Sequence, residues 1–335
     1  MEKYRETETL RALIRDAESI VIVTHLRPDG DAVGSSSAVA HYLHYIGKKT
    51  ITIVRESVPQ TLAFIDTTFA SVPPDEADEA IAHADLIICT DFGVFSRSGQ
   101  ACDALERAKA PKILIDHHPE PETEKFTLCF RSDETSSACE MAFRVIKNLC
   151  DSEVQEHELF SGPCGYCLMA GMTTDTNNFA NSTYPSTLEM AGELLSHGVD
   201  RDDILFNLYN RYRRNRVEAM SYILSNNLTL REDGLAIIKV SMNDWHRFGL
   251  KDGELEGLVN IPLSIDEIKI SLYLREDNDN IHVSIRAKKG WSASDMAKRY
   301  FNGGGHILAS GGSLKIPQDI RTFEDIDNYL KEVKI

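Results

Sequence analysis

The sequence predicts an α/β protein with a doubly wound, mainly parallel sheet, followed by a smaller α+β domain. Short apolar runs that have the length of buried parallel strands carry the first part of this prediction. They lie at residues 20–24, 50–54, 86–90 and 112–115. Helical patterns separate these runs, and a differently ordered set of strand-like segments comes later.

Each element of the first domain has a local reason. The run at 20–24 (IVIVT) is rich in β-branched residues, and it precedes a helix expected over 35–46. That helix carries Ala38, Val39, Tyr42 and other apolar residues at helical spacing, and Gly47 is its expected C-terminal cap. Further helices are expected over 76–84 and 100–109. Strands that alternate with helices predict a parallel sheet covered on both faces.

The second half of the chain reads differently. Residues 186–230 are mostly polar and helical, whereas 235–241, 268–274 and 281–286 are strand-like, with the turn signal REDNDN before the last of them. The length of 335 residues suits two domains. We expect a catalytic domain over 1–190, a helical linker over 191–231 and a substrate-binding domain over 232–335, with a cleft between the two domains.

The charge balance excludes some partners. With 36 Lys and Arg against 52 Asp and Glu, the formal charge is −16, which disfavours a general surface for long nucleic acid. No apolar run approaches the roughly 20 residues that span a bilayer, and the charged N-terminus has no signal-peptide core. Seven scattered cysteines indicate reduced thiols. We therefore expect a cytoplasmic protein with no membrane partner.

Polar residues capable of chemistry follow the predicted strands directly. His25, Asp29 and Asp31 come after the first run, Asp91 after the third, and Asp116, His117 and His118 after the fourth, while Asp175 follows the helical GYCLMAGMTT. In an open parallel sheet, ligands bind beyond the carboxyl ends of the strands. These side chains are therefore expected to converge at one edge.

So many carboxylates cannot share a small site without cations, because they repel each other by several kcal/mol in a partly dry environment. Carboxylate and imidazole ligands without thiolate suit Mn²⁺, Mg²⁺, Co²⁺ or Fe²⁺ better than structural zinc. Six or seven ligands suit two ions about 3.5–4 Å apart, the arrangement used to hydrolyse phosphate esters. Two divalent ions, first of all Mn²⁺, are the predicted cofactors.

These segments resemble the DHH phosphoesterases. The motifs THLRPDGD, CTDFG, DHHPE and GMTTDT look like that family's four catalytic motifs, and Ser284-Ile-Arg286 with Phe301-Asn-Gly-Gly-Gly-His306 resembles the associated DHHA1 domain. The resemblance implies one metal on His25, Asp29 and Asp91, and a second on Asp31, Asp91, His117 and Asp175. It also implies catalytic roles for two residues: His118 would face the substrate phosphate, and Asp116 would orient a histidine ligand.

The glycine-rich loop of the second domain is the other chemical feature. Glycines let backbone N–H groups approach an anion closely, although a turn with a helix C-cap is the favoured interpretation of such a loop when it stands alone. With the resemblance, we expect Arg286, Gly303, Gly304, Gly305 and His306 to bind substrate. Thr135, Ser136, Ser137 and Glu140 either line the same cleft or cap a helix.

The resemblance implies a hydrolase, and several substrates remain open. The leading hypothesis is a manganese-dependent oligoribonuclease and pAp phosphatase. Such an enzyme cleaves RNA of a few residues to mononucleotides in RNA degradation, and it removes the 3′-phosphate of 3′-phosphoadenosine 5′-phosphate (pAp). Alternatives are a cyclic-di-AMP or pApA phosphodiesterase, a pyrophosphatase or exopolyphosphatase, and a non-catalytic nucleotide sensor. A homodimer is expected from the family alone.

Overall fold

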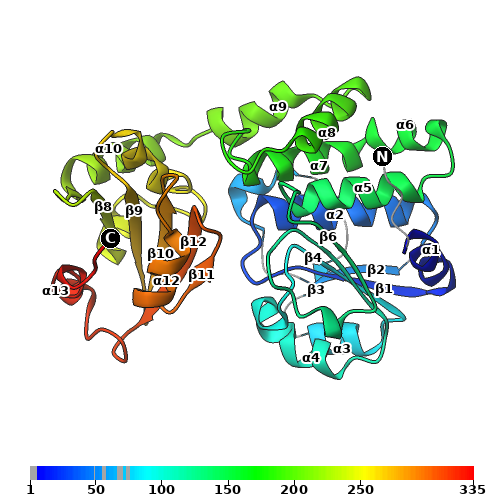
Figure 1. Ribbon diagram of the computed structural model, residues 1–335, viewed down its shortest axis with the longest axis horizontal. Helices are drawn as coiled ribbons and strands as arrows, with labels where there is room; N and C mark the ends of the chain where they lie inside the picture. The colour runs from blue at the N-terminus through cyan, green and yellow to red at the C-terminus, as the bar shows by residue number, and fades with distance from the viewer. Residues whose placement is uncertain (1–5, 49, 55–57, 66–70, 73–75) are drawn as a thin grey trace. The chain divides into compact units, whose positions relative to one another are not determined.

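The structure is a computed structural model that describes residues 6–48, 50–54, 58–65, 71–72 and 76–335. The chain divides into two compact units, Met1–Arg211 and Tyr212–Ile335, each with its own six-stranded sheet (Figure 1). The first five residues of the charged N-terminal stretch lie outside the described residues.

The sheet of the first unit is entirely parallel, with the order β3-β2-β1-β4-β5-β6. Its strands are β1 (Ser19–Val23), β2 (Thr50–Val54), β3 (Ser71–Val72), β4 (Leu86–Thr90), β5 (Lys112–Asp116) and β6 (Leu128–Arg131). The four predicted strands are its central members. The chain winds outward from β1 in one direction and from β4 in the other, so the boundary between β1 and β4 is the topological switch point.

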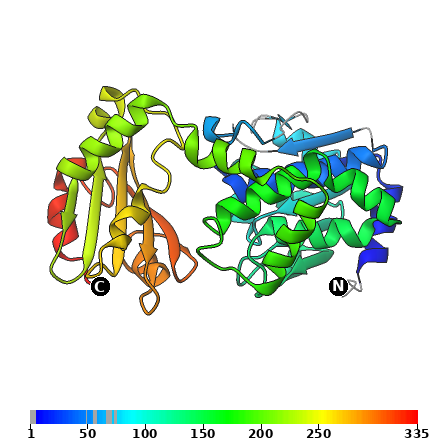
Figure 2. The ribbon, with the colours of Figure 1, turned by 90° about the horizontal axis from the view of Figure 1, so that it is seen from above.

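Helices cover both faces of this sheet, as Figure 1 shows. Ile20 and Ile22 of β1 pack on one side, and Val21 and Val23 pack on the other. The first side holds α1 (Thr7–Asp16), α2 (Gly30–Tyr45), α5 (Ala138–Leu149), α6 (Glu153–Phe160), α7 (Pro163–Asp175), α8 (Pro185–Ser196) and α9 (Arg201–Leu205), seen from above in Figure 2. The second side holds α3 (Ala77–Ala82) and α4 (Cys102–Arg107). The prediction of a doubly wound parallel sheet is confirmed.

The second unit has a mixed sheet with the order β11-β12-β10-β9-β8-β7. Its strands are β7 (Leu228–Leu230), β8 (Leu235–Val240), β9 (Ile270–Asp277), β10 (Asn280–Ala287), β11 (Gly304–Gly305) and β12 (Ala309–Lys315). Only β8 and β9 pair in parallel among the described strands of this sheet. The α+β class predicted for the second half of the chain is confirmed.

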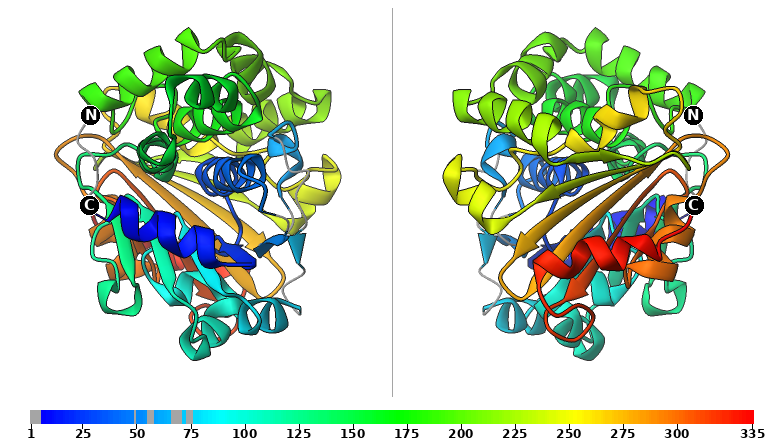
Figure 3. Two further views of the ribbon diagram at one scale, coloured as in Figure 1. Left: turned by 90° about the vertical axis from the view of Figure 1, so that its right-hand side faces the viewer. Right: turned by 90° about the vertical axis from the view of Figure 1, so that its left-hand side faces the viewer.

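The faces of the second sheet are covered by different helices. Helices α12 (Ala293–Tyr300) and α13 (Ile326–Lys331) pack on one face, and the right view of Figure 3 shows α13 lying across it. Helix α10 (Arg214–Asn226), α11 (Met242–Arg247) and the short helix η5 (Leu258–Ser264) lie on the other. The segment 191–231, expected to be a linker, contributes α9 to the first unit and α10 to the second.

Helices α2 and α7 approach each other backbone to backbone. A Cβ atom placed on Gly34 would lie 2.6 Å from the carbonyl oxygen of Cys167, and one placed on Gly171 would lie 2.3 Å from Cys139 Sγ and 2.9 Å from the carbonyl oxygen of Gly30. Only hydrogen at these positions allows this contact. The contact matters for the site because α2 begins, and α7 ends, with residues of the predicted metal centre.

A fully buried carboxylate, Glu140, joins the starts of α5 and α8. It accepts hydrogen bonds from the amide (3.0 Å) and hydroxyl (2.7 Å) of Ser136 and from the hydroxyl of Thr187 in α8 (2.8 Å), and it pairs with Arg144. Ser137 caps α5 by accepting from the amide of Glu140. The expectation that this segment caps a helix is correct.

We predict that Gly171→Ala lowers the free energy of unfolding by about 1–3 kcal/mol, because the added methyl group forces α2 and α7 apart. The control is Gly192→Ala in α8, where no described atom lies within 4 Å of the new Cβ. That substitution should stabilise the protein by about 1 kcal/mol through helix propensity. Chemical denaturation measures both, and equal effects would contradict the close contact.

Acid should remove the contribution of Glu140. Burial raises its pKa, but hydrogen bonds from Ser136 and Thr187 outweigh burial and hold the pKa below its ordinary value of 4.5. A depressed pKa stabilises the fold above the unfolded value, and this stabilisation is lost as the pH falls through the folded value. The stability deficit of Glu140→Gln should therefore shrink from pH 7 to about pH 3.5 in parallel denaturation curves. A deficit that does not change with pH would contradict this.

Candidate metal centre at the carboxyl ends of the parallel strands

The fold brings the predicted metal ligands together at one edge of the first sheet. β1, β4 and β5 are parallel neighbours, so the residues that follow them meet at their shared carboxyl ends. Asp29 caps the N-terminus of α2, and Asp31 lies in its first turn. Asp175 is the last residue of α7, which packs on α2. Two groups of ligand atoms result.

The first group comprises His25, Asp29 and Asp91. His25 Nε2 lies 3.3 Å from Asp91 Oδ2 and 3.9 Å from Asp29 Oδ1. The other ring nitrogen, Nδ1, donates to the carbonyl oxygen of Leu26 at 2.8 Å, which orients Nε2 toward the carboxylates. Nε2 is buried and has no hydrogen bond to any described residue, as expected of a nitrogen that binds a metal.

The second group comprises Asp31, His117 and Asp175. His117 Nε2 lies 3.8 Å from Asp31 Oδ2 and 3.7 Å from Asp175 Oδ2. These spacings are too long for direct hydrogen bonds and leave room for an ion between the ligand atoms.

Asp91 is a member of the first group and also faces the second. While its Oδ2 faces His25, its Oδ1 lies 3.6 Å from His117 Nε2. The backbone of Asp91 has a left-handed φ of 66°, and its amide donates to the carbonyl oxygen of Ile115 in β5 at 3.0 Å. Such a conformation in a residue other than glycine costs roughly 1–3 kcal/mol and is concentrated at functional sites. One oxygen of Asp91 is therefore available to each ion of a pair.

The electrostatics of the site are those of ligands without their cations. Burial, together with the charges of Asp91 and Asp175, raises the pKa of Asp31 well above its usual value, and burial raises that of Asp175 to about 6. Burial lowers the pKa of His25 and His117, but neighbouring carboxylates, Asp91 first, outweigh it and raise the values to about 9 and about 10. Bound cations would favour the ionised carboxylates and the neutral imidazoles.

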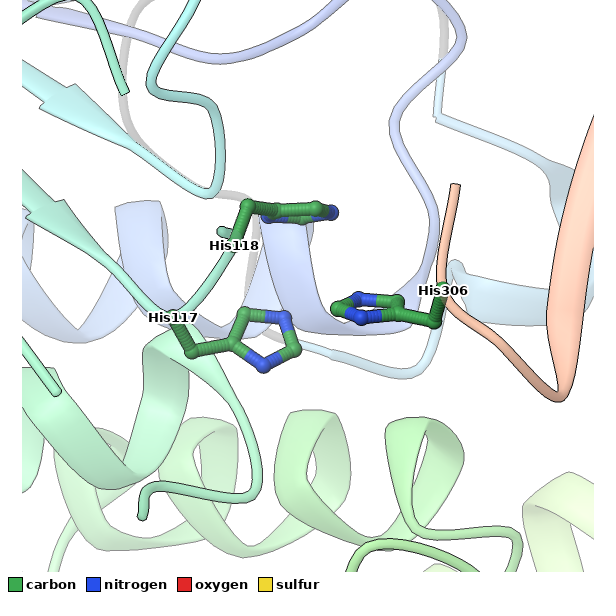
Figure 4. Close-up of side chains that lie close together, drawn as sticks. All are labelled: His117, His118 and His306. Atoms are coloured by element: carbon green, nitrogen blue, oxygen red, sulfur yellow. The ribbon is translucent and has the colours of Figure 1, made fainter. Parts of the chain in front are cut away.

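Within the DHH triplet, Asp116 contacts a different histidine from the one expected. Asp116 Oδ1 accepts hydrogen bonds from the amide of His118 (3.2 Å) and from its Nδ1 (2.8 Å). Asp116 thus orients His118, the residue expected to face substrate, whereas a metal-binding histidine was expected as its partner. Figure 4 shows the rings of His117 and His118 at the end of β5, and their centroids are 4.6 Å apart. A Cβ on Gly93 would lie 2.5 Å from Pro121 Cβ and 2.9 Å from Asp116 Oδ2, so both neighbours favour the glycine in CTDFG.

Sequence reasoning missed the backbone groups that hold Asp31. The amides of Ala138 and Cys139 at the N-terminus of α5 donate to its two carboxylate oxygens at 2.6 and 2.9 Å. An ionised carboxylate is favoured at a helix N-terminus. The pattern Ser137-x-x-Glu140 signals a helix start, but nothing local to residues 137–140 indicates that this start contacts a residue about 107 positions earlier.

The predicted substrate residues of the second unit lie at one end of its sheet. Arg286 lies in β10 opposite Ala309 of β12, and His306 lies in the loop between β11 and β12. Figure 4 also labels His306. Ser310 Oγ donates to the carbonyl oxygen of His306 at 2.8 Å and thereby fixes this loop. The β11–β12 hairpin thus brings His306 to the end of β10 that carries Arg286.

Two of the three loop glycines are required by the hairpin itself. A Cβ on Gly303 would lie 1.9 Å from the carbonyl oxygen of Gly311, and Gly305 has a left-handed φ of 137°. At Gly304, by contrast, the nearest atom to an added Cβ would be Lys298 Cε at 4.0 Å. Lys288 follows β10 in the sequence and is positively charged. Its ammonium group donates to the carbonyl oxygens of Ile265 and Asp266, so these backbone groups of the second unit hold it.

The cysteine pair of α7 lies in the hydrophobic core of the first unit. Cys164 and Cys167, which have CxxC spacing, are buried in α7, and all seven cysteines are free thiols. Among the described residues, none of the helices combines the length and apolar character needed to cross a membrane.

Comparisons with known proteins identify both units. Residues 19–172 match the DHH family, N-terminal domain, and residues 233–332 match the DHHA1 domain. The bifunctional oligoribonuclease and PAP phosphatase NrnA of Bacillus subtilis is 28% identical, and the alignment covers 98% of this chain and 99% of that protein. The cyclic-di-AMP phosphodiesterase GdpP of Geobacillus thermodenitrificans is 22% identical over 92% of this chain but only 46% of that protein.

A solved structure is similar to this chain over nearly its whole length. The exopolyphosphatase-related protein from Bacteroides fragilis superposes with a TM-score of 0.87 at 32% sequence identity, and the match covers 98% of this chain and 95% of that one. The resemblance expected from the motifs is therefore confirmed. The chain belongs to the DHH family and carries a DHHA1 domain as its second unit.

Proposed function

We propose that this protein is a metal-dependent phosphoesterase that hydrolyses short oligoribonucleotides to mononucleotides and removes the 3′-phosphate of pAp. The observation that carries the proposal is the arrangement of Asp91, which offers one carboxylate oxygen to each of two ligand groups. Paired divalent ions that share a ligand are the arrangement used to hydrolyse phosphate esters. The relative from Bacillus subtilis, which bears this activity in its name, aligns with the chain from end to end.

In this proposal the two ligand groups hold one divalent cation each. The residues fit such ions because they combine carboxylates with imidazoles and leave His25 Nε2 and Asp91 Oδ1 buried without a hydrogen bond to any described residue. When bound, the cations supply positive charge for the phosphoryl oxygens and lower the pKa of water. The chain itself contributes His118, held by Asp116, as the group that contacts the phosphate and protonates the leaving oxygen.

Mn²⁺ is the proposed ion, with Mg²⁺ and Co²⁺ as alternatives. A zinc site would be favoured by a thiolate ligand, and the thiol that contacts Asp31 of the second ligand group is that of Cys139. Cys139 Sγ lies 3.6 Å from the backbone oxygen of Asp31, and burial, with the Asp31 charge, raises the pKa of this thiol well above its usual value. This sulfur donates to a backbone oxygen and belongs to neither ligand group, so the donors of the two groups are carboxylate oxygens and imidazole nitrogens.

The second unit is proposed to bind the substrate. Arg286 offers a guanidinium to a phosphate, and His306 and the open position at Gly304 lie at the same end of the sheet. The net charge of −16 disfavours long polyanions, so a short oligonucleotide or a small nucleotide is the proposed ligand.

Other substrates have narrower support. The cyclic-di-AMP phosphodiesterase relative aligns with this chain over less than half of its own length. The Bacteroides fragilis structure carries an exopolyphosphatase-related title, which keeps inorganic polyphosphate and pyrophosphate among the alternatives. Loss of a candidate ligand residue would favour a non-catalytic nucleotide sensor, and all the candidate ligands predicted from the sequence are present.

The proposal is tested with one substrate panel in the presence of Mn²⁺: RNA of two to five residues, pAp, pApA, cyclic di-AMP and pyrophosphate. We expect turnover of the short RNA and of pAp, and its loss when the metal is chelated. Turnover of cyclic di-AMP alone, or of pyrophosphate alone, would contradict the proposed substrate. Full activity after chelation would contradict metal dependence.

The matched variant is Asp91→Asn. Asparagine tolerates the left-handed backbone of this position, so the fold should survive while the shared charge is lost. We expect kcat to fall by at least about 10³-fold, or roughly 4 kcal/mol. Far-UV circular dichroism checks the fold, and a folded Asp91→Asn variant with full activity would contradict the role of Asp91.

The glycine loop is tested with Gly304→Val. The new side chain enters open space and should leave stability unchanged, but it would occupy the position at which a phosphate approaches the backbone. We expect KM for pAp to rise by about tenfold, or roughly 1.4 kcal/mol. Gly192→Val on the open side of α8 is the control and should keep the wild-type KM. An unchanged KM in Gly304→Val would remove this loop from the proposed binding site.

A further inference from the structure

We infer that Glu140 is a positioning residue for only one of the two metal positions, the one formed by Asp31, His117 and Asp175. The inference rests on the metal centre of the proposed function and goes beyond it, because Glu140 contacts none of the ligand atoms. It predicts that one buried carboxylate sets the affinity of one ion and leaves that of the other unchanged.

The first step is the direction of the Asp31 carboxylate. Both of its oxygens accept backbone amides at the N-terminus of α5, from Ala138 at 2.6 Å and from Cys139 at 2.9 Å. The side chain is 1% exposed, so water cannot replace these donors. A displacement of the first turn of α5 would therefore draw the Asp31 carboxylate with it and change the 3.8 Å separation between Oδ2 and His117 Nε2.

The second step is the hold of Glu140 on that turn. In an ordinary capping box, the acidic residue at the third helical position binds the amide of the cap residue itself. Glu140 reaches one residue further back and accepts both the amide and the hydroxyl of Ser136. Since Ser137 in turn caps α5, this contact fixes the chain immediately before the two amides that bind Asp31.

The third step links Glu140 to Asp175. The hydroxyl of Thr187, which accepts from the amide of Tyr184 at the start of α8, donates to Glu140. The segment from residue 176 to residue 184 joins the end of α7, where Asp175 lies, to this start of α8. Glu140 therefore anchors the far end of the loop that begins at Asp175, as well as the turn that holds Asp31.

The supports of the first ligand group lie outside α5 and α8, and one of them is the backbone amide of Asp31, whose carboxylate belongs to the second group. His25 is oriented by the carbonyl oxygen of Leu26, and Asp29 accepts amides of its own helix, from Asp31 at 3.0 Å and from Ala32 at 3.1 Å. Asp91, which serves both groups, is held by β5 through Ile115. None of these described contacts comes from α5 or α8. The asymmetry between the two groups is what makes the inference testable.

The experiment measures Mn²⁺ binding to the full chain by isothermal titration calorimetry, without substrate. In Glu140→Gln, we expect one of two Kd values to rise by 10–100-fold, the range typical of residues that orient metal ligands, and the other to stay within about twofold. Thr187→Val, which removes one donor to Glu140, should weaken the same site to a smaller extent. Val145→Ala, a core change in the same helix away from its N-terminus, should leave both Kd values unchanged.

Double variants assign the affected site. In an Asp175→Asn background the Glu140→Gln change should have little further effect, whereas in a His25→Gln background it should keep its full effect. Equal weakening of both sites would overturn the inference, since that result indicates general loosening of the fold. So would unchanged binding in Glu140→Gln or, if that variant does not fold, in Thr187→Val. A wild-type chain that binds fewer than two Mn²⁺ ions would instead overturn the proposed metal centre itself.

Discussion

The crowding of negative charge beyond β1, β4 and β5 is the constraint on which the rest of the first unit depends. Asp31 and Asp91 are buried. Asp91 Oδ1 and Asp175 Oδ2 both lie close to His117 Nε2, at 3.6 Å and 3.7 Å. Two such charges about 4 Å apart repel by roughly 4 kcal/mol at the effective dielectric constant near a protein surface. Burial is the main cause that raises the pKa values of Asp31 and Asp175, and the neighbouring carboxylate charges raise them further. Divalent cations bound to the two ligand groups would offset this repulsion.

The fold supplies what this crowding requires. The reversal of strand order between β1 and β4 leaves their carboxyl ends open, because the helices that follow these strands lie on opposite faces of the sheet. Gly34 and Gly171 allow α2 and α7 to approach closely enough for Asp31 and Asp175 to face one imidazole. The N-terminus of α5 then fixes the buried carboxylate of Asp31. Backbone contacts, more than side chains, set the positions of the ligands.

The convergence of most of the candidate ligands was predictable because they follow apolar strands, where the residue type alone indicates a position at the sheet edge. The four central strands were predicted for the same reason, whereas the edge strands β3 and β6 are short and have no strong apolar pattern. The predicted hydrogen-bond partner of Asp116 was wrong: it is His118 and not a metal-binding histidine. The sequence alone does not distinguish between two adjacent histidines. The support of Asp31 by α5 was not predictable, because it joins residues about 107 positions apart. The roles of Arg286, Gly304 and His306 stay predictions.

The central claim is that Asp91 lies between two divalent ions. Crystals of the protein grown with Mn²⁺ test it directly through the anomalous scattering of manganese. The account predicts two anomalous peaks about 3.5–4 Å apart, one beside His25 and one beside His117, with a different oxygen of Asp91 on each. A single peak, or a pair of peaks away from Asp91, would contradict it.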